Sequence, residues 1–172
     1  LRGILTIESA ATNNVLIKRE LTPSTDKPYL IEKYTLINKG SRDVSVEVED
    51  FEKNSRSQPG KSFYGVYEIS ANIIGSGIYT LKPNESLSFT MVFSGRRITE
   101  PKAVPDADAE ISKRKAFTDL AFTNLQFVSP DTVLNRMFAF ASIRAMESIF
   151  ETKGGLVHSP GGGAYYAAIW AN

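Results

Sequence analysis

The sequence predicts a mainly β protein with a helical C-terminal part. We expect an antiparallel β-sandwich over residues 1–100, a linker with one helix over 101–128, and the start of a helical domain over 129–172. Three observations predict this order. Short runs that alternate apolar and polar residues fill the first part, a segment with prolines and charges follows, and the last part spaces its apolar residues three and four apart.

Turn signals separate the predicted strands. Val44, Val46 and Val48 alternate with polar and acidic residues, so we expect the valines to face a core. Gly40 and Pro83 stand in the two clearest turns, where glycine permits a positive φ and proline presets φ. We expect residues 55–60 to form a polar loop. The predicted strands are 4–7, 15–21, 29–37, 44–48, 64–74, 78–81 and 87–93.

Two helices are expected after residue 105. The first covers Ala107–Leu120, and the second covers about Pro130–Lys153, with Ser129 as N-cap and Gly154 as C-terminal cap. At 1.5 Å per residue the second helix would be roughly 35 Å long and would need other helices as neighbours. Because the sequence also ends on an apolar run, we expect a larger protein to continue beyond Asn172.

Composition excludes several classes of function. Twenty basic and nineteen acidic residues give a net charge of +1, which argues against a nucleic-acid binder. The chain has no cysteine and one histidine, so we expect no metal site, and nothing predicts a cofactor. No run reaches the roughly 20 apolar residues of a membrane span.

The segment 154–172 is the densest in residues that contact ligands. It combines a glycine-rich loop with adjacent tyrosines, the only histidine and the only tryptophan. Aromatic rings bind sugars because pyranose C–H groups pack on their faces while polar neighbours bond the hydroxyls. Core aromatics and a flexible turn are the alternatives, and the lysine of a phosphate-binding loop is missing. The candidate substrate-binding residues are Trp170, Asn172, Tyr166, Tyr165 and His158.

Two carboxylates, Glu147 and Glu151, stand one turn apart on the second predicted helix. Paired carboxylates perform glycoside hydrolysis, but Arg144 and Lys153 nearby favour a solvated charged face. We therefore assign no catalytic residue.

A family resemblance follows from the order of these elements and from Gly161-Gly-Gly-Ala-Tyr-Tyr-Ala-Ala-Ile-Trp-Ala-Asn172. The chain resembles the N-terminal portion of bacterial six-hairpin glycosidases, the glucoamylase-like, amylo-α-1,6-glucosidase-like and α-rhamnosidase-like enzymes. In these enzymes a β-sandwich and a helical linker precede an α/α toroid. Trp170 is similar to the tryptophan of their Trp-x-x-Asp motif, whose aspartate would follow Asn172.

The resemblance implies part of a glycoside hydrolase whose catalytic carboxylates lie outside this chain. Its partners would be an oligosaccharide or glycoside substrate and the remainder of its own polypeptide or a partner chain. A bacterial periplasmic or extracellular location is favoured over the cytoplasm.

A non-enzymatic module is the alternative. Tyr34–Gly40, Val44–Val48 and Leu81–Ser86 are similar to immunoglobulin-like binding or adhesion domains of bacterial surface or periplasmic proteins. An assembly subunit that packs its helix against a second copy is a third possibility. The long helix and the terminal loop favour the enzyme, because an adhesion sandwich has no use for them.

Overall fold

The computed structural model of the chain describes residues 3–12, 14–62, 64–102, 104–152 and 154–158. The chain divides into two compact units, Ile4–Arg114 and Leu1–Gly3 with Lys115–Asn172. Of the described residues, those of the first unit form antiparallel strands and the beginning of a helix. Those of the second form the rest of that helix, a second helix and a β-hairpin.

This architecture confirms the predicted fold class of antiparallel β structure followed by helices. The finer domain limits at residues 100 and 128, and the assignment of the second helix to a toroid, stay predictions.

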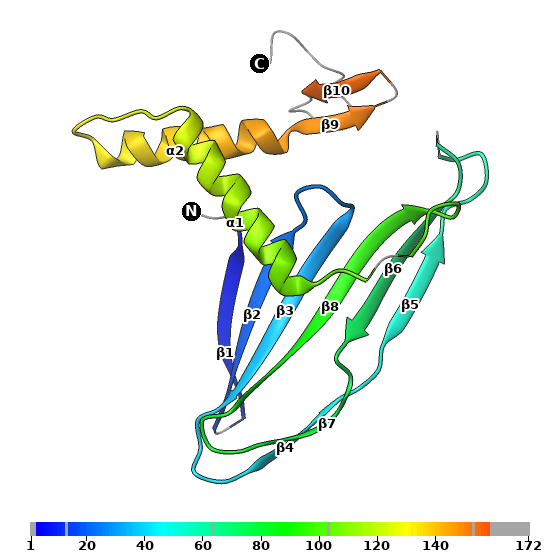
Figure 1. Cartoon of the computed structure of the whole chain (residues 1–172), viewed down its shortest axis with the longest axis vertical. Helices are drawn as coiled ribbons and strands as arrows, with labels where there is room; N and C mark the ends of the chain where they lie inside the picture. Colours follow the sequence, from blue (N-terminus) through cyan, green and yellow to red (C-terminus); the bar gives the residue numbers. More distant parts are fainter. Residues whose placement is uncertain (1–2, 13, 63, 103, 153, 159–172) are drawn as a thin grey trace. The chain divides into compact units, whose positions relative to one another are not determined.

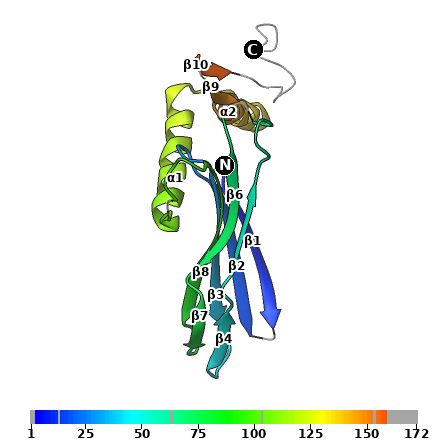
Figure 2. The same ribbon diagram turned by 90° about the vertical axis from the view of Figure 1, so that its right-hand side faces the viewer.

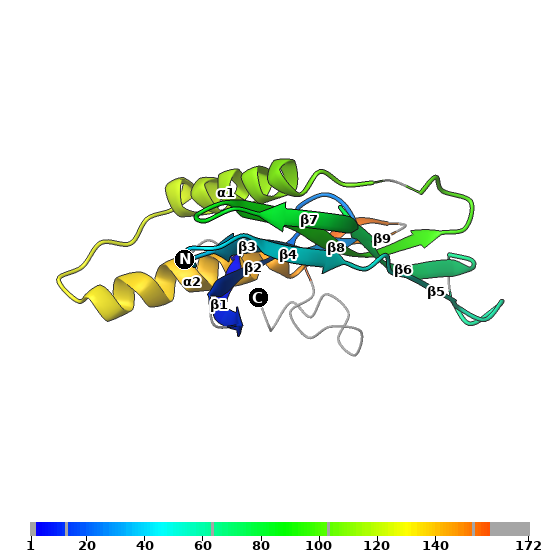
Figure 3. The same cartoon turned by 90° about the horizontal axis from the view of Figure 1, so that it is seen from below.

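Among the described residues, one sheet has six antiparallel strands in the order β1-β2-β3-β8-β6-β5 (Figure 1). A second sheet consists of β4 and β7, which lie side by side in Figure 3. The bounds are β1 Leu5–Thr12, β2 Val15–Pro23, β3 Tyr29–Asn38, β4 Val44–Val48, β5 Glu52–Arg56, β6 Tyr67–Ile74, β7 Gly77–Leu81, β8 Ser86–Arg97, α1 Ala107–Asn124 and α2 Thr132–Glu147.

One face of the six-stranded sheet, which we call the layered face, packs against β4 and β7. Its core is formed by Val15, Leu36 and Leu81, which are buried together. Val44 and Val46 pack against this cluster, and Glu47 between Val46 and Val48 is exposed. The predicted inward position of the valines is therefore confirmed.

The opposite face, the helix face, lies beside the beginning of α1 (Figure 2). Thr22, Ile31 and Val92 stand directly opposite one another on β2, β3 and β8 and are at most 1% exposed. Lys33, on the same face of β3, forms an ion pair of 2.5 Å with Asp108 of α1. Burial on both faces makes β3 the centre of the first unit.

Strand β5 was not expected. Its sequence Glu-Lys-Asn-Ser-Arg is polar and all five residues are exposed, so no alternation of apolar residues marks it. It is nevertheless an edge strand, paired with β6 from Glu52↔Asn72 to Arg56↔Glu68. The predicted polar loop 55–60 is wrong in its first two residues, because pairing with β6 extends the strand to Arg56.

The predicted second helix is wrong at both ends. Asp131, rather than Ser129, is the N-cap: its side chain accepts hydrogen bonds from the backbone N–H groups of Val133 and Leu134. Ser129 instead bonds the side chain of Asn135. The helix ends at Glu147 and is about 24 Å long rather than 35 Å.

A β-hairpin replaces the expected last turns of that helix. Strands β9, Ile149–Thr152, and β10, Gly155–His158, pair antiparallel. The chain turns between them at adjacent glycines, and Gly155 has a φ of +110°, which favours glycine. Gly154 therefore belongs to a hairpin turn and not to a helix cap. Branched and aromatic residues in β9 also favour a strand.

Candidate functional site

The hairpin β9–β10 carries the one predicted site residue that the structure describes. His158 is the last residue of β10, is half-buried, and pairs with Ile149 of β9. The hairpin follows α2 after Ser148 alone, so the strand pairing orients the backbone of His158 within the second unit. Tyr165, Tyr166, Trp170 and Asn172 lie outside the described residues, and their predicted sugar contacts stay predictions.

The predicted position of Glu147 and Glu151 on one helix face is wrong. Glu147 ends α2 and forms an ion pair of 3.2 Å with Arg144, whereas Glu151 lies on β9. The two residues therefore do not share a helix face. The hairpin separates them because the chain leaves the helix at Ser148.

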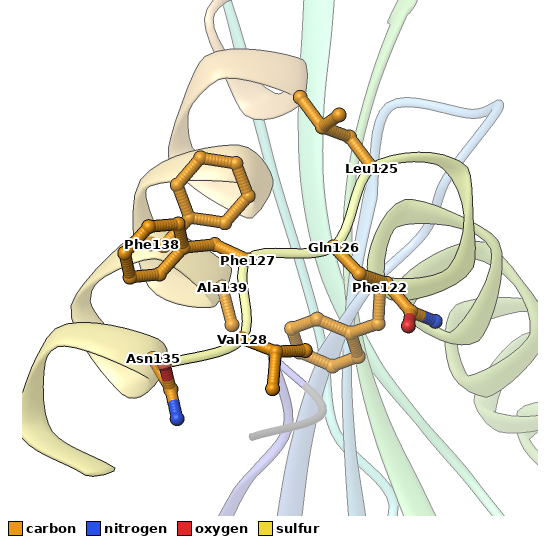
Figure 4. Close-up of a pocket in the computed structure, with 8 residues that line it drawn as sticks. All are labelled: Phe122, Leu125, Gln126, Phe127, Val128, Asn135, Phe138 and Ala139. Atoms are coloured by element: carbon orange, nitrogen blue, oxygen red, sulfur yellow. The ribbon is translucent and has the colours of Figure 1, made fainter. Parts of the chain in front are cut away.

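A cavity of about 270 Å³ lies in the second unit between the end of α1 and α2 (Figure 4). Phe127 and Phe138 meet across it with ring centroids 5.6 Å apart. Asn135 is one of its two polar residues, and its amide is already bonded to Ser129. The cavity lining is Phe122, Leu125, Gln126, Phe127, Val128, Asn135, Phe138 and Ala139.

Among the described residues that line this cavity none is titratable, so this lining offers no group for acid–base catalysis. Apolar side chains can fill it, and the site therefore suits packing rather than chemistry. The cavity could not be predicted from the sequence, because the second helix was expected to be longer and the first was expected to end at Leu120.

A second apolar surface covers the other side of α2. Val133, Leu134, Met137 and Phe140 form a stripe at helical spacing, and each of these side chains is 47% exposed or more. The stripe lies opposite Asn135 and Ala139, which face the cavity. A helix that is apolar on opposite sides is suited to being surrounded by other helices.

The layered face contains a charged group among apolar neighbours. Arg19 Nε donates a hydrogen bond of 2.5 Å to Glu32 Oε1, and the guanidinium of Arg19 lies 5.4 Å from the ring centre of Tyr34. Tyr34 in turn stacks on Phe89, with ring centroids 4.8 Å apart and planes 4° apart. Neither charge was identified from the sequence.

Electrostatics within this group favour the ion pair. The hydrogen bond to Glu32 raises the pKa of Arg19, and burial is the main cause that raises the pKa of Tyr34. Arg19 therefore stays charged and Tyr34 stays neutral at ordinary pH. Because the Glu32 side chain is only 7% exposed, its carboxylate depends on Arg19 for compensation.

A second ion cluster lies at the β5–β6–β8 end of the sheet. Arg56 Nε donates a hydrogen bond of 3.0 Å to one oxygen of Glu68, and Arg96 donates one of 2.6 Å to the other. These bonds, that of Arg56 first, lower the pKa of Glu68 below its ordinary value. Arg96 also donates to the backbone oxygen of Glu100, so the cluster ties the sheet to the segment before α1.

This lowered pKa predicts an acid-dependent stability. A folded-state pKa below the unfolded one stabilises the protein above the ordinary glutamate range, and this contribution is lost as the pH falls through the lowered pKa. Between about pH 5 and about pH 3 we expect the urea midpoint to fall less for Glu68→Gln than for the wild type. Glu47→Gln removes an exposed carboxylate outside the cluster and is the control. Equal acid dependence in wild type and Glu68→Gln would contradict the prediction.

No known family model and no curated protein matches this chain. The resemblance to six-hairpin glycosidases therefore stays a prediction. In the part of the chain that the structure describes, neither helix is long and apolar enough to cross a membrane.

Proposed function

We propose that this chain is the N-terminal portion of a glycoside hydrolase of the six-hairpin type. In this proposal the sandwich supports a helical catalytic domain, α2 is the first helix of that domain, and the segment after the β9–β10 hairpin forms one wall of the sugar pocket. The catalytic acid and base, two carboxylates on either side of the glycosidic bond, would come from other parts of the polypeptide or from a partner chain.

The two apolar sides of α2 carry this proposal. One side faces the cavity lined by Phe127 and Phe138, and the other presents the exposed stripe that includes Met137 and Phe140. Large exposed apolar surfaces are costly in water and mark surfaces that other protein covers. Further helices on both sides would bury them, which is the arrangement of a helical toroid.

In this proposal the sugar pocket is formed by the segment that follows the hairpin. His158 ends β10, and the glycine- and aromatic-rich segment follows it in the sequence. In the proposal Trp170 and Tyr166 present ring faces to a sugar, while Asn172 and His158 bond its hydroxyls. Tyr165 contributes a second phenol ring.

The immunoglobulin-like binding module stays the alternative. The six-stranded sheet and the β4–β7 layer fit both functions equally well. An adhesion domain has no need for a helix that is apolar on opposite sides, so α2 favours the hydrolase. A binding function confined to the sandwich would leave this helix without a role.

Trp170 offers a direct test because it is the only tryptophan of the chain. We expect its fluorescence to change saturably when the chain is titrated with at least one member of a panel of α-linked glucose and rhamnose oligosaccharides. Tyr166→Ala should weaken that binding at least tenfold, which corresponds to about 1.4 kcal/mol. The chain alone should not hydrolyse the sugar.

Two controls make the titration specific. Tyr64→Ala, which removes an exposed tyrosine from the first unit, should leave the affinity unchanged. Glycerol at matched concentration corrects for changes of the solvent. If no oligosaccharide produces a saturable change, or if Tyr64→Ala weakens binding as much as Tyr166→Ala, the proposed pocket is wrong.

A further inference from the structure

A groove in the first unit runs along one side of β4. Its volume is about 550 Å³, within the range of sites that bind ligands. Every residue from Val44 to Phe51 lines it, so the groove follows β4 over its whole length and continues past its end. Its floor is the layered face of the six-stranded sheet. The floor residues are Ala11, Val15, Ile17, Leu36, Ile73, Phe89 and Met91.

The groove lies on the side of β4 that faces away from β7. None of the residues of β7, Gly77–Leu81, lines it, although β7 pairs with β4 from Val44↔Leu81 to Val48↔Gly77. Among the described strands, β7 is the only one that pairs with β4. In an antiparallel pair every second residue directs its N–H and C=O groups away from the partner. The groove is therefore bounded by a strand edge with backbone groups available for pairing.

A strand bound in the groove would need apolar side chains on the side that contacts the floor. Apart from the polar groups of β4 and the residues just after it, its lining is aliphatic, aromatic or methionine. A strand placed beside β4 would direct alternate side chains onto this floor and the others toward solvent. Such a strand would also widen the β4–β7 layer. The wider layer would cover Ile17 and Met91, which are only half-buried without it.

The charged residues that line the groove indicate which side chains such a strand would direct toward solvent. The charged residues that line the groove are Glu47, Glu49 and Asp50, and all three are exposed. The described lining contains no basic residue. Opposite charges on neighbouring strands stabilise their pairing, whereas like charges destabilise it. Lysine or arginine at the outward positions would therefore face Glu47 across the new strand pair.

We propose that the groove binds a β-strand of a partner polypeptide in which apolar and basic residues alternate. The strand adds to the free edge of β4, directs its apolar residues onto the layered face and places its basic residues beside Glu47, Glu49 and Asp50. Main-chain hydrogen bonds supply affinity and the alternate side chains supply specificity. This site is separate from the proposed sugar pocket and does not depend on it.

Three peptides test the proposal with the full chain. The first alternates valine and lysine over eight residues, the second is the same peptide with N-methyl groups on alternate amides, and the third has glutamate in place of lysine. We expect fluorescence anisotropy to detect binding of the first peptide. Both other peptides should bind at least tenfold more weakly, the second because its edge hydrogen bonds are blocked and the third because its charge is reversed. High salt should reduce the difference in affinity between the first and third peptides.

Two matched variants locate the binding. Ala11 lines the groove, and its neighbour Ala10 on the same strand does not, while both are exposed. Ala11→Phe should weaken binding of the lysine peptide at least tenfold, and Ala10→Phe should leave it unchanged. Glu47→Lys should reverse the preference in favour of the glutamate peptide. Hydrogen exchange should slow at alternate amides of Val44–Val48, because only every second amide faces the added strand.

Each of three negative results would contradict the proposal. If the lysine peptide does not bind, the groove takes no strand of this chemistry. If N-methylation has no effect, the groove accepts apolar cations without strand pairing. Equal effects of Ala11→Phe and Ala10→Phe would place the binding elsewhere. None of these results bears on Trp170 fluorescence with sugars, so the proposed function can fail or stand independently.

Discussion

Replacing Asn38 by leucine is expected to lower the free energy of unfolding by about 3 to 4 kcal/mol. Asn38 is fully buried at the end of β3. Its side-chain amide donates hydrogen bonds to the backbone oxygens of Arg42, at 2.8 Å, and Leu81, at 3.0 Å. Its side-chain oxygen accepts one of 2.9 Å from the backbone N–H of Gly40.

Leucine would fill a similar volume but would leave these backbone groups without their partner. A buried polar group that loses its hydrogen bond costs about 1 to 3 kcal/mol, far more than the net gain from an ordinary hydrogen bond. The bond to Leu81 also joins β3 of the large sheet to β7 of the small one. Asn38 therefore holds the two layers of the sandwich together, and its loss should loosen the β4–β7 layer first.

Urea unfolding measures this effect, with Asn54→Leu as the matched control. Asn54 lies on the edge strand β5 and is exposed, and its side chain donates a hydrogen bond to the exposed side chain of Glu52, so its replacement should change stability by less than about 0.5 kcal/mol. Asn38→Asp should also lower the stability. A carboxylate keeps the acceptor for Gly40 but loses both donors and introduces a buried charge. A loss below about 1 kcal/mol for Asn38→Leu would show that water replaces the missing partners.

The strands with clear alternation could be predicted from the sequence. Val44, Val46 and Val48 identify β4 and its inward side, because one side chain in two reaches the core. The helix expected at Ala107–Leu120 is also present and extends to Asn124. In these elements local pattern and tertiary packing favour the same structure.

Other elements depend on contacts that no local pattern reveals. Strand β5 is polar throughout and exists because β6 offers it a partner. The end of α2 was predicted wrongly because Ile149 and Phe150 continue the helical spacing, although pairing with Val157 and His158 places them in a strand. The role of Asn38 between the layers could not be predicted from the sequence, because it depends on the positions of Leu81 and Arg42.

Part of the charged group on the layered face could have been predicted. Arg19 interrupts the apolar alternation of Val15, Ile17 and Leu21, and Glu32 interrupts that of β3. Opposite charges that break two neighbouring apolar patterns indicate an ion pair across strands. The pairing of β2 with β3, which places Arg19 opposite Tyr34, was still needed to bring the two charges together. The candidate sugar residues after position 158 rest on the sequence alone.

Replacing Ile31 by alanine is expected to lower the free energy of unfolding by about 3 kcal/mol. Ile31 is fully buried on the helix face, and its direct neighbours Thr22 and Val92 are at most 1% exposed. The β-strands on both sides fix the backbone, so the neighbouring side chains cannot move in to fill the space. The cost is therefore the lost transfer free energy of the removed carbons plus that of the cavity left behind.

A graded series separates this cavity effect from other causes. Ile31→Val removes one methylene and should cost about 1 kcal/mol, while Ile31→Ala removes more and should cost about three times as much. Ile69→Ala is the matched control: Ile69 also lies on a strand of this sheet but is 62% exposed, so its loss should stay within about 0.5 kcal/mol. Urea unfolding measures the loss of stability of the three variants from the shift of the midpoint, provided that the m-value stays constant. If Ile31→Ala costs no more than Ile69→Ala, the side chains around Ile31 on the helix face are not tightly packed, because a fully enclosed isoleucine and an exposed one would then be equivalent.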